Sequence, residues 1–435
     1  MTKKSKFELK MIGEGLPSSS IKRFHKYLEN MINPNTHKWA WDDLQPINKE
    51  SLPQITDNQS TSPEALKKLA VIKLNGGLGT SMGCHGPKSA IIAKNNQSFL
   101  EIALNNHKAL CAETGTAIPF ILMNSYRTHK VTTARLRSYE ASFPIHTFIQ
   151  NQFPRIKTDT ITPFEHLSDE ETWNPPGHGD IYYALFETTL GQQLIDQGIE
   201  TLFISNTDNV GATVSNDILA NIEQTKASFV MEVTPKTLAD KKGGTLVHFQ
   251  DQLMLLERAQ VPVEKIREFE SIDRFSIFNT NNIWVNLPEL NTLIKTNKLN
   301  LTVMQNPKTI NGQQVTQLET AMGDAIHSFP NAQAVLVPRS RFIPVKTTAD
   351  LLRLRSDYFI VNELKKIVPN PNRACFNTVL PITLSDDYTK IEDFETLIPT
   401  PPSLVDCTSL TMNKAHKVGA NTVFTGDIVI EDNLE

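Results

Sequence analysis

The chain has 435 residues, of which 39% are hydrophobic and 21% charged, and its formal net charge is −4. This composition is ordinary for a globular protein, and the length predicts two or three domains. A slightly acidic chain has no overall positive field that would attract nucleic acid. We therefore expect no nucleic-acid partner, and any anion-binding site must be local.

The sequence shows no pattern of export or membrane insertion. The first residues, MTKKSKFELK, are basic, but no apolar segment follows them as it would in a signal peptide. No stretch approaches the roughly 18 apolar residues of a membrane span. The cysteines are scattered without metal-ligand spacing, which is typical of reduced thiols in the cytosol. We expect a cytoplasmic protein with no membrane partner. The cysteines are Cys84, Cys111, Cys375 and Cys407.

Residues 1–65 are predicted to form a helical appendage. Over residues 20–32, SIKRFHKYLENMI, apolar residues recur at helical spacing, and the segments that follow are loop-rich. We expect this helix to pack on a larger domain through one face. The residues expected on that face are Ile21, Phe24, Tyr27, Leu28 and Ile32.

From about residue 66 to 402, apolar runs alternate with helical patterns. Between the first two runs, Ser98 and Glu101 form a capping-box pattern, and Gly115 marks a helix end. This alternation predicts an α/β domain with a mostly parallel sheet, in which ligands bind at the carboxyl ends of the strands. The runs with strand character include LAVIKLN, IPFILMN, IHTFIQ, ETLFISN and SFVMEVT.

The last part of the chain, 403–435, has a different character. The Pro-rich stretch LIPTPPSL (397–404) predicts a boundary near residue 402. After it, VGANTVFTGDIVIEDN (418–433) alternates small or polar residues with Val, Phe and Ile, a pattern typical of short β-rungs. We therefore expect a short β-helix-like segment at the end.

The segment Leu74–Ser89, LNGGLGTSMGCHGPKS, contains five glycines and one lysine directly after an apolar run. Glycine lets backbone N–H groups approach a ligand closely, and several such groups in succession bind an anion. The segment therefore predicts a phosphate-binding loop. Because Cys84 lies within it, we hypothesise that oxidation of this thiol would affect activity.

Two generic phosphate motifs do not fit this loop. The P-loop requires Gly directly before Lys-Ser/Thr, whereas Pro87 precedes Lys88. The dinucleotide fingerprint requires G-x-G-x-x-G, whereas Gly77, Gly79 and Gly83 give G-x-G-x-x-x-G. The nearest acid downstream lies inside the predicted helix. A dehydrogenase is therefore poorly supported.

The glycine segment resembles the signature of the UDP-glucose pyrophosphorylase family, also called UTP–glucose-1-phosphate uridylyltransferases, in its eukaryotic-type branch. Ser81 stands where the wider nucleotidyltransferase loop has a basic residue, as in this branch. Further matching motifs follow in order over roughly residues 20–430, and together they are far more specific than one motif. The resemblance implies an α/β fold with a Rossmann-like, GT-A-like mixed sheet and helices on both faces. The further motifs are QNQFPRI, PPGHGDIY, SNTDNVGA, MEVTPKTLADKKGGTL, FNTNNIWVNL and VPRSRFIPVKTTADLL.

The reaction implied by the resemblance is UTP plus glucose 1-phosphate giving UDP-glucose and pyrophosphate. The attacking sugar phosphate is already an anion, so the site must supply positioning and positive charge rather than a base. Lys88 directly follows the glycines and can reach the triphosphate. Lys346 matches the second family lysine that contacts phosphate. Arg339 and Arg341 lie near Lys346 in sequence, with a less clear role.

Asp208 follows the apolar run LFISN, so we expect it at the carboxyl end of a strand. A carboxylate there can hold Mg²⁺ together with substrate phosphates. An Asp at such a place is also a common turn former. The resemblance makes Asp208 the Mg²⁺ ligand and implies catalytic roles for Lys88, Asp208 and Lys346.

The resemblance also implies the substrate contacts. Uracil is read by Gln150, by the backbone around Gly177 and by the loop start; Ile149 replaces the more usual Asn in this region. His178 lies between two glycines and is implied to contact glucose 1-phosphate. The loop start comprises Leu74, Asn75, Gly76 and Gly77, and the sugar-phosphate set comprises Gly76, His178, Asn206, Gly244, Glu257 and Asn281.

Two other readings remain open at this point. A UDP-sugar or UDP-N-acetylhexosamine pyrophosphorylase would use the same chemistry, although such enzymes carry the basic residue that Ser81 replaces. A non-catalytic regulator that binds nucleotide sugars would not need both lysines and Asp208. The sequence does not distinguish a monomer from a homo-oligomer.

Overall fold

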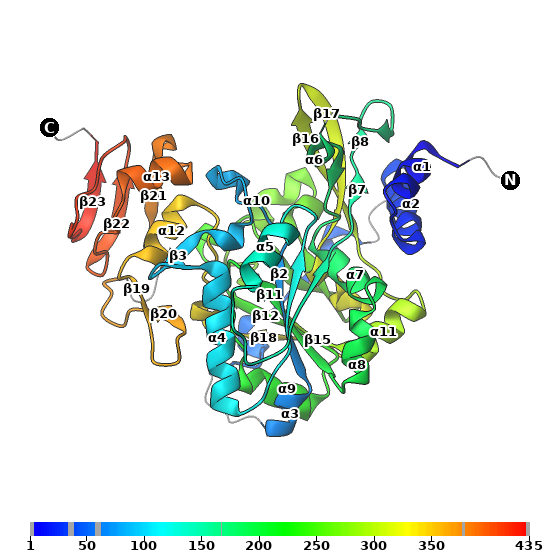
Figure 1. Cartoon of the computed structure of the whole chain (residues 1–435), viewed down its shortest axis with the longest axis horizontal. Coiled ribbons are helices and arrows are strands. Elements are labelled where there is room, and N and C mark those ends of the chain that lie inside the picture. Colours follow the sequence, from blue (N-terminus) through cyan, green and yellow to red (C-terminus); the bar gives the residue numbers. More distant parts are fainter. Residues whose placement is uncertain (1–3, 34–38, 57–61, 167, 376–378, 432–435) are drawn as a thin grey trace.

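A central mixed sheet organises the computed structural model, which describes residues 4–33, 39–56, 62–166, 168–375 and 379–431 (Figure 1). Within these residues the sheet has seven strands, and all neighbours pair in parallel except that β15 is antiparallel to both β11 and β12. In spatial order the strands are β18 (Ala332–Leu336), β12 (Phe229–Pro235), β15 (Ile277–Asn286), β11 (Thr201–Asn206), β2 (Leu69–Asn75), β5 (Phe120–Asn124) and β6 (Ile145–Ile149).

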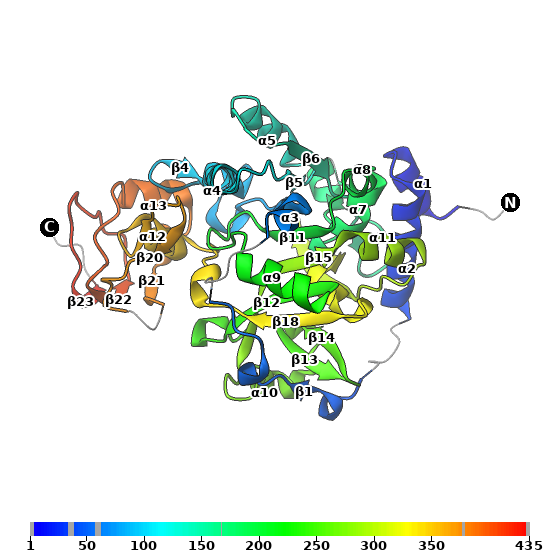
Figure 2. The ribbon, with the colours of Figure 1, turned by 90° about the horizontal axis from the view of Figure 1, so that it is seen from below.

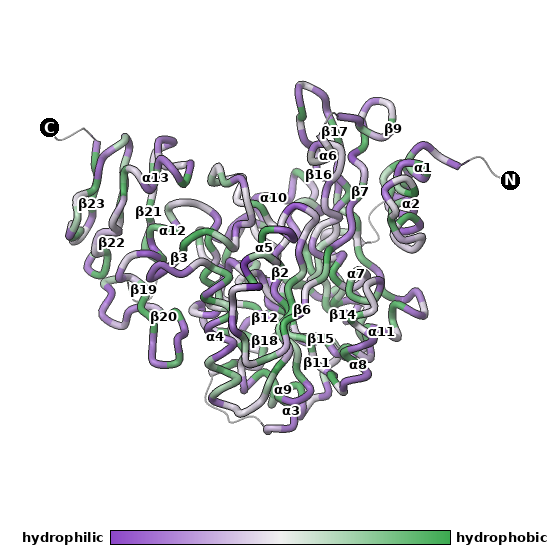
Figure 3. Tube along the Cα trace, in the orientation of Figure 1, coloured by the Kyte–Doolittle hydropathy of each residue, from purple (hydrophilic) through white to green (hydrophobic). Residues whose placement is uncertain are grey.

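The five apolar runs identified in the sequence all form strands of this sheet, as predicted. Four of them, β2, β5, β11 and β12, are buried along almost their whole length, which is typical of strands covered on both faces. Figure 3 shows the hydrophobic residues gathered along the central strands. The sequence therefore located most of the sheet.

Helices cover both faces of the sheet, and a separate apolar core lies between each face and its helices. One core contains residues of α7 (Ile181–Glu187), α8 (Leu190–Asp196) and α11 (Leu287–Lys295). The other contains residues of α3 (Pro63–Lys67), α4 (Phe99–Thr114) and α9 (Asn216–Thr225). Because strand side chains alternate between faces, neighbouring residues Val71 and Ile72 of β2 lie in different cores.

The ends of α4 follow the predicted signals. The hydroxyl of Ser98 accepts from the N–H of Glu101, and the carboxylate of Glu101 accepts from the N–H of Ser98 at 2.7 Å. Gly115 ends the helix with φ of 63°. No helix among the described residues is long and apolar enough to cross a membrane.

Two N-terminal helices, α1 (Lys6–Gly13) and α2 (Ser18–Ile32), lie at one end of the molecule (Figures 1 and 2). The predicted face of α2 is buried except at Ile32, which is 53% exposed because it lies at the last position of the helix. Buried residues of α1 and α2 pack with Phe153 and Trp173. Arg23 of α2 also pairs with Asp180 and Glu187. The appendage is therefore joined to the central part by both packing and charge.

Smaller sheets and helices surround the central sheet. The strands β13 and β14 form a hairpin that pairs with β1 through β13, and the long hairpin β16–β17 pairs through β17 with β8, which in turn pairs with β9. The remaining elements outside the C-terminal part are β1 (Gln45–Pro46), β3 (Ile92–Lys94), β4 (Gln97–Ser98), α5 (His129–Leu136), β7 (Phe153–Pro154), β8 (Ile156–Lys157), β9 (Thr162–Pro163), α6 (Asp169–Thr172), β10 (Trp173–Asn174), β13 (Thr245–Phe249), β14 (Gln252–Leu256), α10 (Ile266–Phe269), β16 (Val303–Ile310) and β17 (Gln313–Thr320).

The C-terminal part lies at the end opposite α1 and α2 (Figures 1 and 2). Its core contains residues on both sides of the Pro-rich stretch, such as Leu351, Phe394 and Leu410. Strands β21, β22 and β23 pair in parallel. The domain limits at residues 65 and 402 stay a prediction. The elements are α12 (Thr348–Arg355), β19 (Phe359–Val361), β20 (Ile367–Pro369), β21 (Ile382–Leu384), α13 (Ile391–Leu397), β22 (Cys407–Met412) and β23 (Gly426–Ile430).

Candidate active site

A cavity of about 410 Å³ lies where β2 and β11 end, at the carboxyl edge of the sheet. This volume lies within the range of small-molecule sites. Ten of the residues singled out in the sequence line it. They are Leu74, Asn75, Gly76, Gly77, Lys88, Gln150, Gly177, His178, Asn206 and Asp208, and the other lining residues are Leu78, Ser89, Met123, Pro175, Thr207 and Glu319.

The pairing of the strands explains why these residues meet. Leu74 of β2 lies opposite Asn206 of β11, and Asn75 lies opposite Asn124 of β5. The side-chain amide of Asn75 donates to Asn124 Oδ1 at 2.6 Å and to Thr132 Oγ1 at 2.8 Å. The side chain of Asn75 therefore supports the strand end.

The glycine loop continues from β2 as two short 3-10 turns, Thr80–Met82 and Lys88–Ala90. The next α-helix, α4, begins only at Phe99. A dinucleotide fingerprint places its glycines directly at a helix N-terminus, so this geometry argues against a dehydrogenase. Within the loop, burial raises the pKa of the Cys84 thiol, which lowers its thiolate fraction at neutral pH.

Two glycines are required by close approach of other residues. A Cβ atom on Gly76 would lie 2.5 Å from Nε2 of Gln150, a residue that is only 6% exposed. Gly177 has φ of 81°, and a Cβ there would collide with the backbone of Thr320. The cavity wall between Gly76 and Gln150 therefore has no room for an additional side chain.

Lys88 and Asp208 form an ion pair at the cavity, with side chains 17% and 20% exposed. Lys88 donates to Oδ2 of Asp208, and no hydrogen bond within the described residues reaches the other carboxylate oxygen. Mg²⁺ is bound in nucleotide sites by one or two carboxylates together with phosphates. The carboxylate of Asp208 at the cavity fits such an ion.

His178 is held as a neutral imidazole. Its Nδ1 accepts from the backbone N–H of Met322 at 3.0 Å, and burial lowers the pKa of His178 to about 4. A neutral ring whose Nδ1 accepts carries its proton on Nε2. His178 can therefore donate one hydrogen bond, but it brings no positive charge to the cavity.

Four predicted site residues lie outside the cavity lining: Gly244, Glu257, Asn281 and Lys346. Asn281 adjoins the cavity, because its side-chain amide donates to Asn206 Oδ1 at 3.1 Å. Glu257 packs on Gly244, where a Cβ atom would lie 2.6 Å from Glu257 Oε1. Burial raises the pKa of Glu257 to about 7, repulsion by Asp324 adds to the shift, and Lys346 opposes it.

Lys346 is fixed through its backbone. Its N–H donates to Oδ2 of Asp350 at 2.9 Å, and its carbonyl accepts from the Ser81 hydroxyl at 3.3 Å. Ser81 thus connects the glycine loop to Lys346. The two nearby arginines are engaged elsewhere, since Arg339 pairs with Asp240 and Arg341 with the fully buried Glu232.

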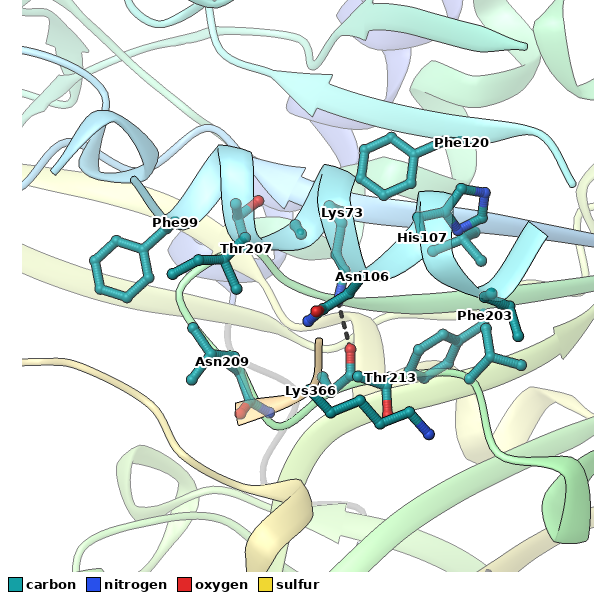
Figure 4. Close-up of a pocket in the computed structure, with 17 residues that line it drawn as sticks. Lys73, Phe99, Asn106, His107, Phe120, Phe203, Thr207, Asn209, Thr213 and Lys366 are labelled. Carbon is teal, nitrogen blue, oxygen red and sulfur yellow. Dashed lines mark hydrogen bonds between the residues drawn. The ribbon is translucent and has the colours of Figure 1, made fainter. Parts of the chain in front are cut away.

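A second cavity, of about 40 Å³, lies between α4 and the sheet (Figure 4). Lys73 projects into it and donates to Ser205 Oγ at 2.8 Å and to the Ala212 carbonyl at 2.7 Å. Burial lowers the pKa of Lys73 to about 7. This space has room for a few water molecules but not for a substrate. Because Ser205 and Ala212 flank the loop that carries Asp208, Lys73 stabilises that loop.

Glu319 was not predicted from the sequence as a site residue. This residue of β17 lines the larger cavity, and Asn306 donates to it at 3.2 Å. Burial raises the pKa of the Glu319 carboxyl. The only local signal was an acid in the stretch QLETAMG, and its proximity to Gly177 depends on tertiary packing.

Comparisons with known proteins identify the family of this chain. The family model described as UTP--glucose-1-phosphate uridylyltransferase matches residues 21–425. UTP--glucose-1-phosphate uridylyltransferase 2 of Dictyostelium discoideum is 40% identical, with 98% of this chain and 88% of that protein covered. The potato (Solanum tuberosum) UTP--glucose-1-phosphate uridylyltransferase is 38% identical, with 97% and 89% covered.

Solved structures of UDP-glucose pyrophosphorylases are also similar to this chain. The UDP-glucose pyrophosphorylase from Leishmania major, known in open and closed structures, superposes with a TM-score of 0.88 at 34% identity, covering 98% of this chain and 96% of that one. The Trypanosoma brucei protein, described as a UDP-glucose phosphorylase, has a TM-score of 0.88 at 36% identity, with 98% and 94% covered. The chain belongs to the UTP–glucose-1-phosphate uridylyltransferase family.

Proposed function

We propose that the protein catalyses the formation of UDP-glucose and pyrophosphate from UTP and glucose 1-phosphate. The observation that carries this proposal is the position of the Lys88–Asp208 ion pair beside Gly76 and Gln150 on one cavity. A cation, a carboxylate and a close-fitting wall at the carboxyl ends of parallel strands suit a metal-assisted nucleotide site. Family membership supports the same reaction.

In this reaction a phosphate oxygen of the sugar attacks the α-phosphorus of UTP in line. The new P–O bond replaces the bond to pyrophosphate, which leaves with the electron pair, and no proton is transferred. Lys88 would contact the triphosphate, and Lys346 would neutralise charge near the reacting phosphorus. Mg²⁺ bound by Asp208 would supply further positive charge for the phosphates.

The same proposal assigns residues to the uracil of UTP and to the sugar phosphate. Gln150, Gly177 and residues 74–77 would read uracil through hydrogen bonds along one edge. On the sugar side, His178 would donate from Nε2. The other proposed sugar-phosphate contacts are Gly76, Asn206, Gly244, Glu257 and Asn281.

We extend the proposal to the finer features of the fold. The central sheet corresponds to the Rossmann-like, GT-A-like arrangement of nucleotidyltransferases. The parallel strands β21, β22 and β23 represent a short β-helix. We expect the compartment to be the cytoplasm.

The test is pyrophosphate release from UTP and Mg²⁺ with a panel of sugar 1-phosphates. We expect release to favour glucose 1-phosphate strongly. Comparable release with N-acetylglucosamine or galactose 1-phosphate would instead indicate a UDP-N-acetylhexosamine or a broad UDP-sugar pyrophosphorylase. Binding of UTP without release for any sugar would favour a non-catalytic regulator.

A further inference from the structure

The two proposed catalytic lysines are both attached to short elements that meet away from the cavity. Lys88 begins a 3-10 turn that leads directly into β3 (Ile92–Lys94). Lys346 precedes α12, and Asp350 in the first turn of α12 binds its backbone N–H. The position of each lysine therefore follows the position of its element.

At the junction, Lys94 of β3 caps the C-terminal end of α12. Its side chain is buried, and its ammonium donates to the carbonyls of Arg355 at 3.2 Å, Ser356 and Phe359 at 2.8 Å. The last carbonyls of a helix have no partner within the helix and attract a positive charge. An ammonium has three N–H donors, so this contact uses all of them.

Arg355, in the last turn of α12, makes the contact from the helix back to β3. Its guanidinium donates to the carbonyl of Ile92 in β3 from Nε at 3.1 Å and from Nη2 at 2.7 Å. Nη2 also pairs with Glu395 at 2.7 Å. The strand holds the helix and the helix holds the strand, so β3 and α12 are joined reciprocally.

We propose that Lys94 is a positioning residue, which sets the separation of Lys88 and Lys346 by holding β3 to the end of α12. This inference rests on the proposed function, in which both lysines contact the reacting phosphates. A displacement of about 1 Å at a reacting centre can cost about a hundredfold in rate. Loss of the junction should therefore affect the chemical step although Lys94 contacts no substrate.

The protonation of Lys94 makes this role measurable. Burial lowers the pKa of Lys94 to about 8, and the nearby Asp357 opposes the shift. The other charged groups that face it are Arg355 on α12 and, across a neighbouring cavity, Lys108 of α4 and Lys365 of the β19–β20 turn. Below pH 8 the ammonium donates three bonds; above it the neutral amine has only two donors, and the junction weakens.

The experiment compares Lys94→Met, Lys94→Arg and Lys108→Met in the full chain, with kcat and the KM for UTP measured from pH 6.5 to 9.5. Lys94→Met should lower kcat about tenfold or more, with the KM for UTP changed less than about twofold. The activity of the wild type should fall above about pH 8, where Lys94 loses its proton. Lys94→Arg should keep kcat and should not show this fall, because arginine stays protonated. Lys108→Met is the matched control, an exposed lysine on the same cavity, and should behave as wild type.

A purely structural cap would give a different pattern. Loss of a cap alone lowers the melting temperature but leaves kcat of the folded enzyme unchanged. Combining Lys94→Met with Lys346→Ala separates the two cases, because a residue that acts through Lys346 should cost little more once Lys346 is gone.

Folded Lys94→Met with wild-type kcat would overturn the inference. If that variant does not fold, Lys94→Arg decides, because an unchanged alkaline fall would overturn it equally. A wild-type chain that forms no UDP-glucose would refute the proposed function and this inference together. An active wild type with insensitive Lys94 variants would refute this inference alone.

Discussion

The proposed nucleotide side and the proposed sugar side of the candidate site are built by different means. On the nucleotide side, Gly76 and Gly177 leave bare backbone against Gln150 and Thr320, and fit is determined by contacts too close for an added carbon. On the sugar side, Glu257 is a half-buried residue whose carboxyl pKa is raised to about 7, and it packs on Gly244. The first side depends on shape and the second on charge.

This difference predicts which perturbation each side will detect. An added methyl group should disturb the nucleotide side at any pH. A change of pH should disturb the sugar side in the wild-type protein, because Glu257 titrates near neutrality. Lys346 is linked to both sides, since its carbonyl accepts from Ser81 of the glycine loop and its charge lowers the pKa of Glu257.

The largest effect is expected for Lys346→Ala. If Lys346 acts mainly in the transition state, kcat should fall about a hundredfold or more, and the KM for UTP should change much less. Steady-state kinetics with varied UTP measures both. Lys295→Ala, in the last turn of α11, is a control that should leave both constants unchanged. A rise in KM at constant kcat would assign Lys346 to ground-state binding.

An intermediate effect is expected for Gly76→Ala. The new Cβ would lie 2.5 Å from Gln150 Nε2, so Gln150 must move from its place. We expect the KM for UTP to rise about tenfold with a smaller change in kcat, because the lost contact is made in both ground and transition states. Gly86→Ala is the matched control, since a Cβ on Gly86 meets nothing within 4 Å. Equal kinetics for the two variants would contradict the shape argument.

Local signals explain what the sequence predicted correctly. Each of these signals is contained within a few consecutive residues. They are the caps of α4 and the apolar runs of β2, β5, β6, β11 and β12. Strand β15 was not among the predicted strands, because the polar stretch Asn279–Asn282 interrupts its apolar pattern. Those side chains are satisfied by distant partners: Thr280 donates to the Glu232 carbonyl, and Asn282 donates to the Glu232 carboxylate.

In the candidate site, too, only residues with a local sequence signal could be predicted. Residues at the ends of strands, such as Leu74 and Asp208, could be grouped from the sequence because parallel strands end at one edge. The surroundings of Glu319 and Lys94 could not be anticipated, since Lys94 meets α12 only after the chain has folded back across most of its length. Long-range contacts of this kind carry no local pattern.

The smallest effect on activity, and the sharpest test of the charge argument, is expected for Glu257→Gln. In the wild type the KM for glucose 1-phosphate should fall as pH rises through about 7, because the ionised carboxylate accepts bonds from sugar hydroxyls. In the variant this KM should be nearly independent of pH and within about threefold of the wild-type value at pH 8. A variant that keeps the wild-type pH dependence would remove Glu257 from the sugar side.

Stability gives an independent readout of the same group. The folded pKa of Glu257 lies above its ordinary value of 4.5, so between pH 4.5 and about 7 the folded state binds the proton and the unfolded state does not. The contribution of Glu257 to the free energy of unfolding should therefore fall as pH rises through this window, by on the order of 3 kcal/mol at most, whereas His178, whose pKa is lowered, contributes in the opposite direction. When urea unfolding is compared at pH 5 and pH 8, Glu257→Gln should raise the free energy of unfolding relative to the wild type more at pH 8 than at pH 5, whereas the exposed Glu264→Gln should shift it equally at both pH values. Because this slope involves no substrate, it would show whether the sugar side is tuned by charge even before any ligand is bound.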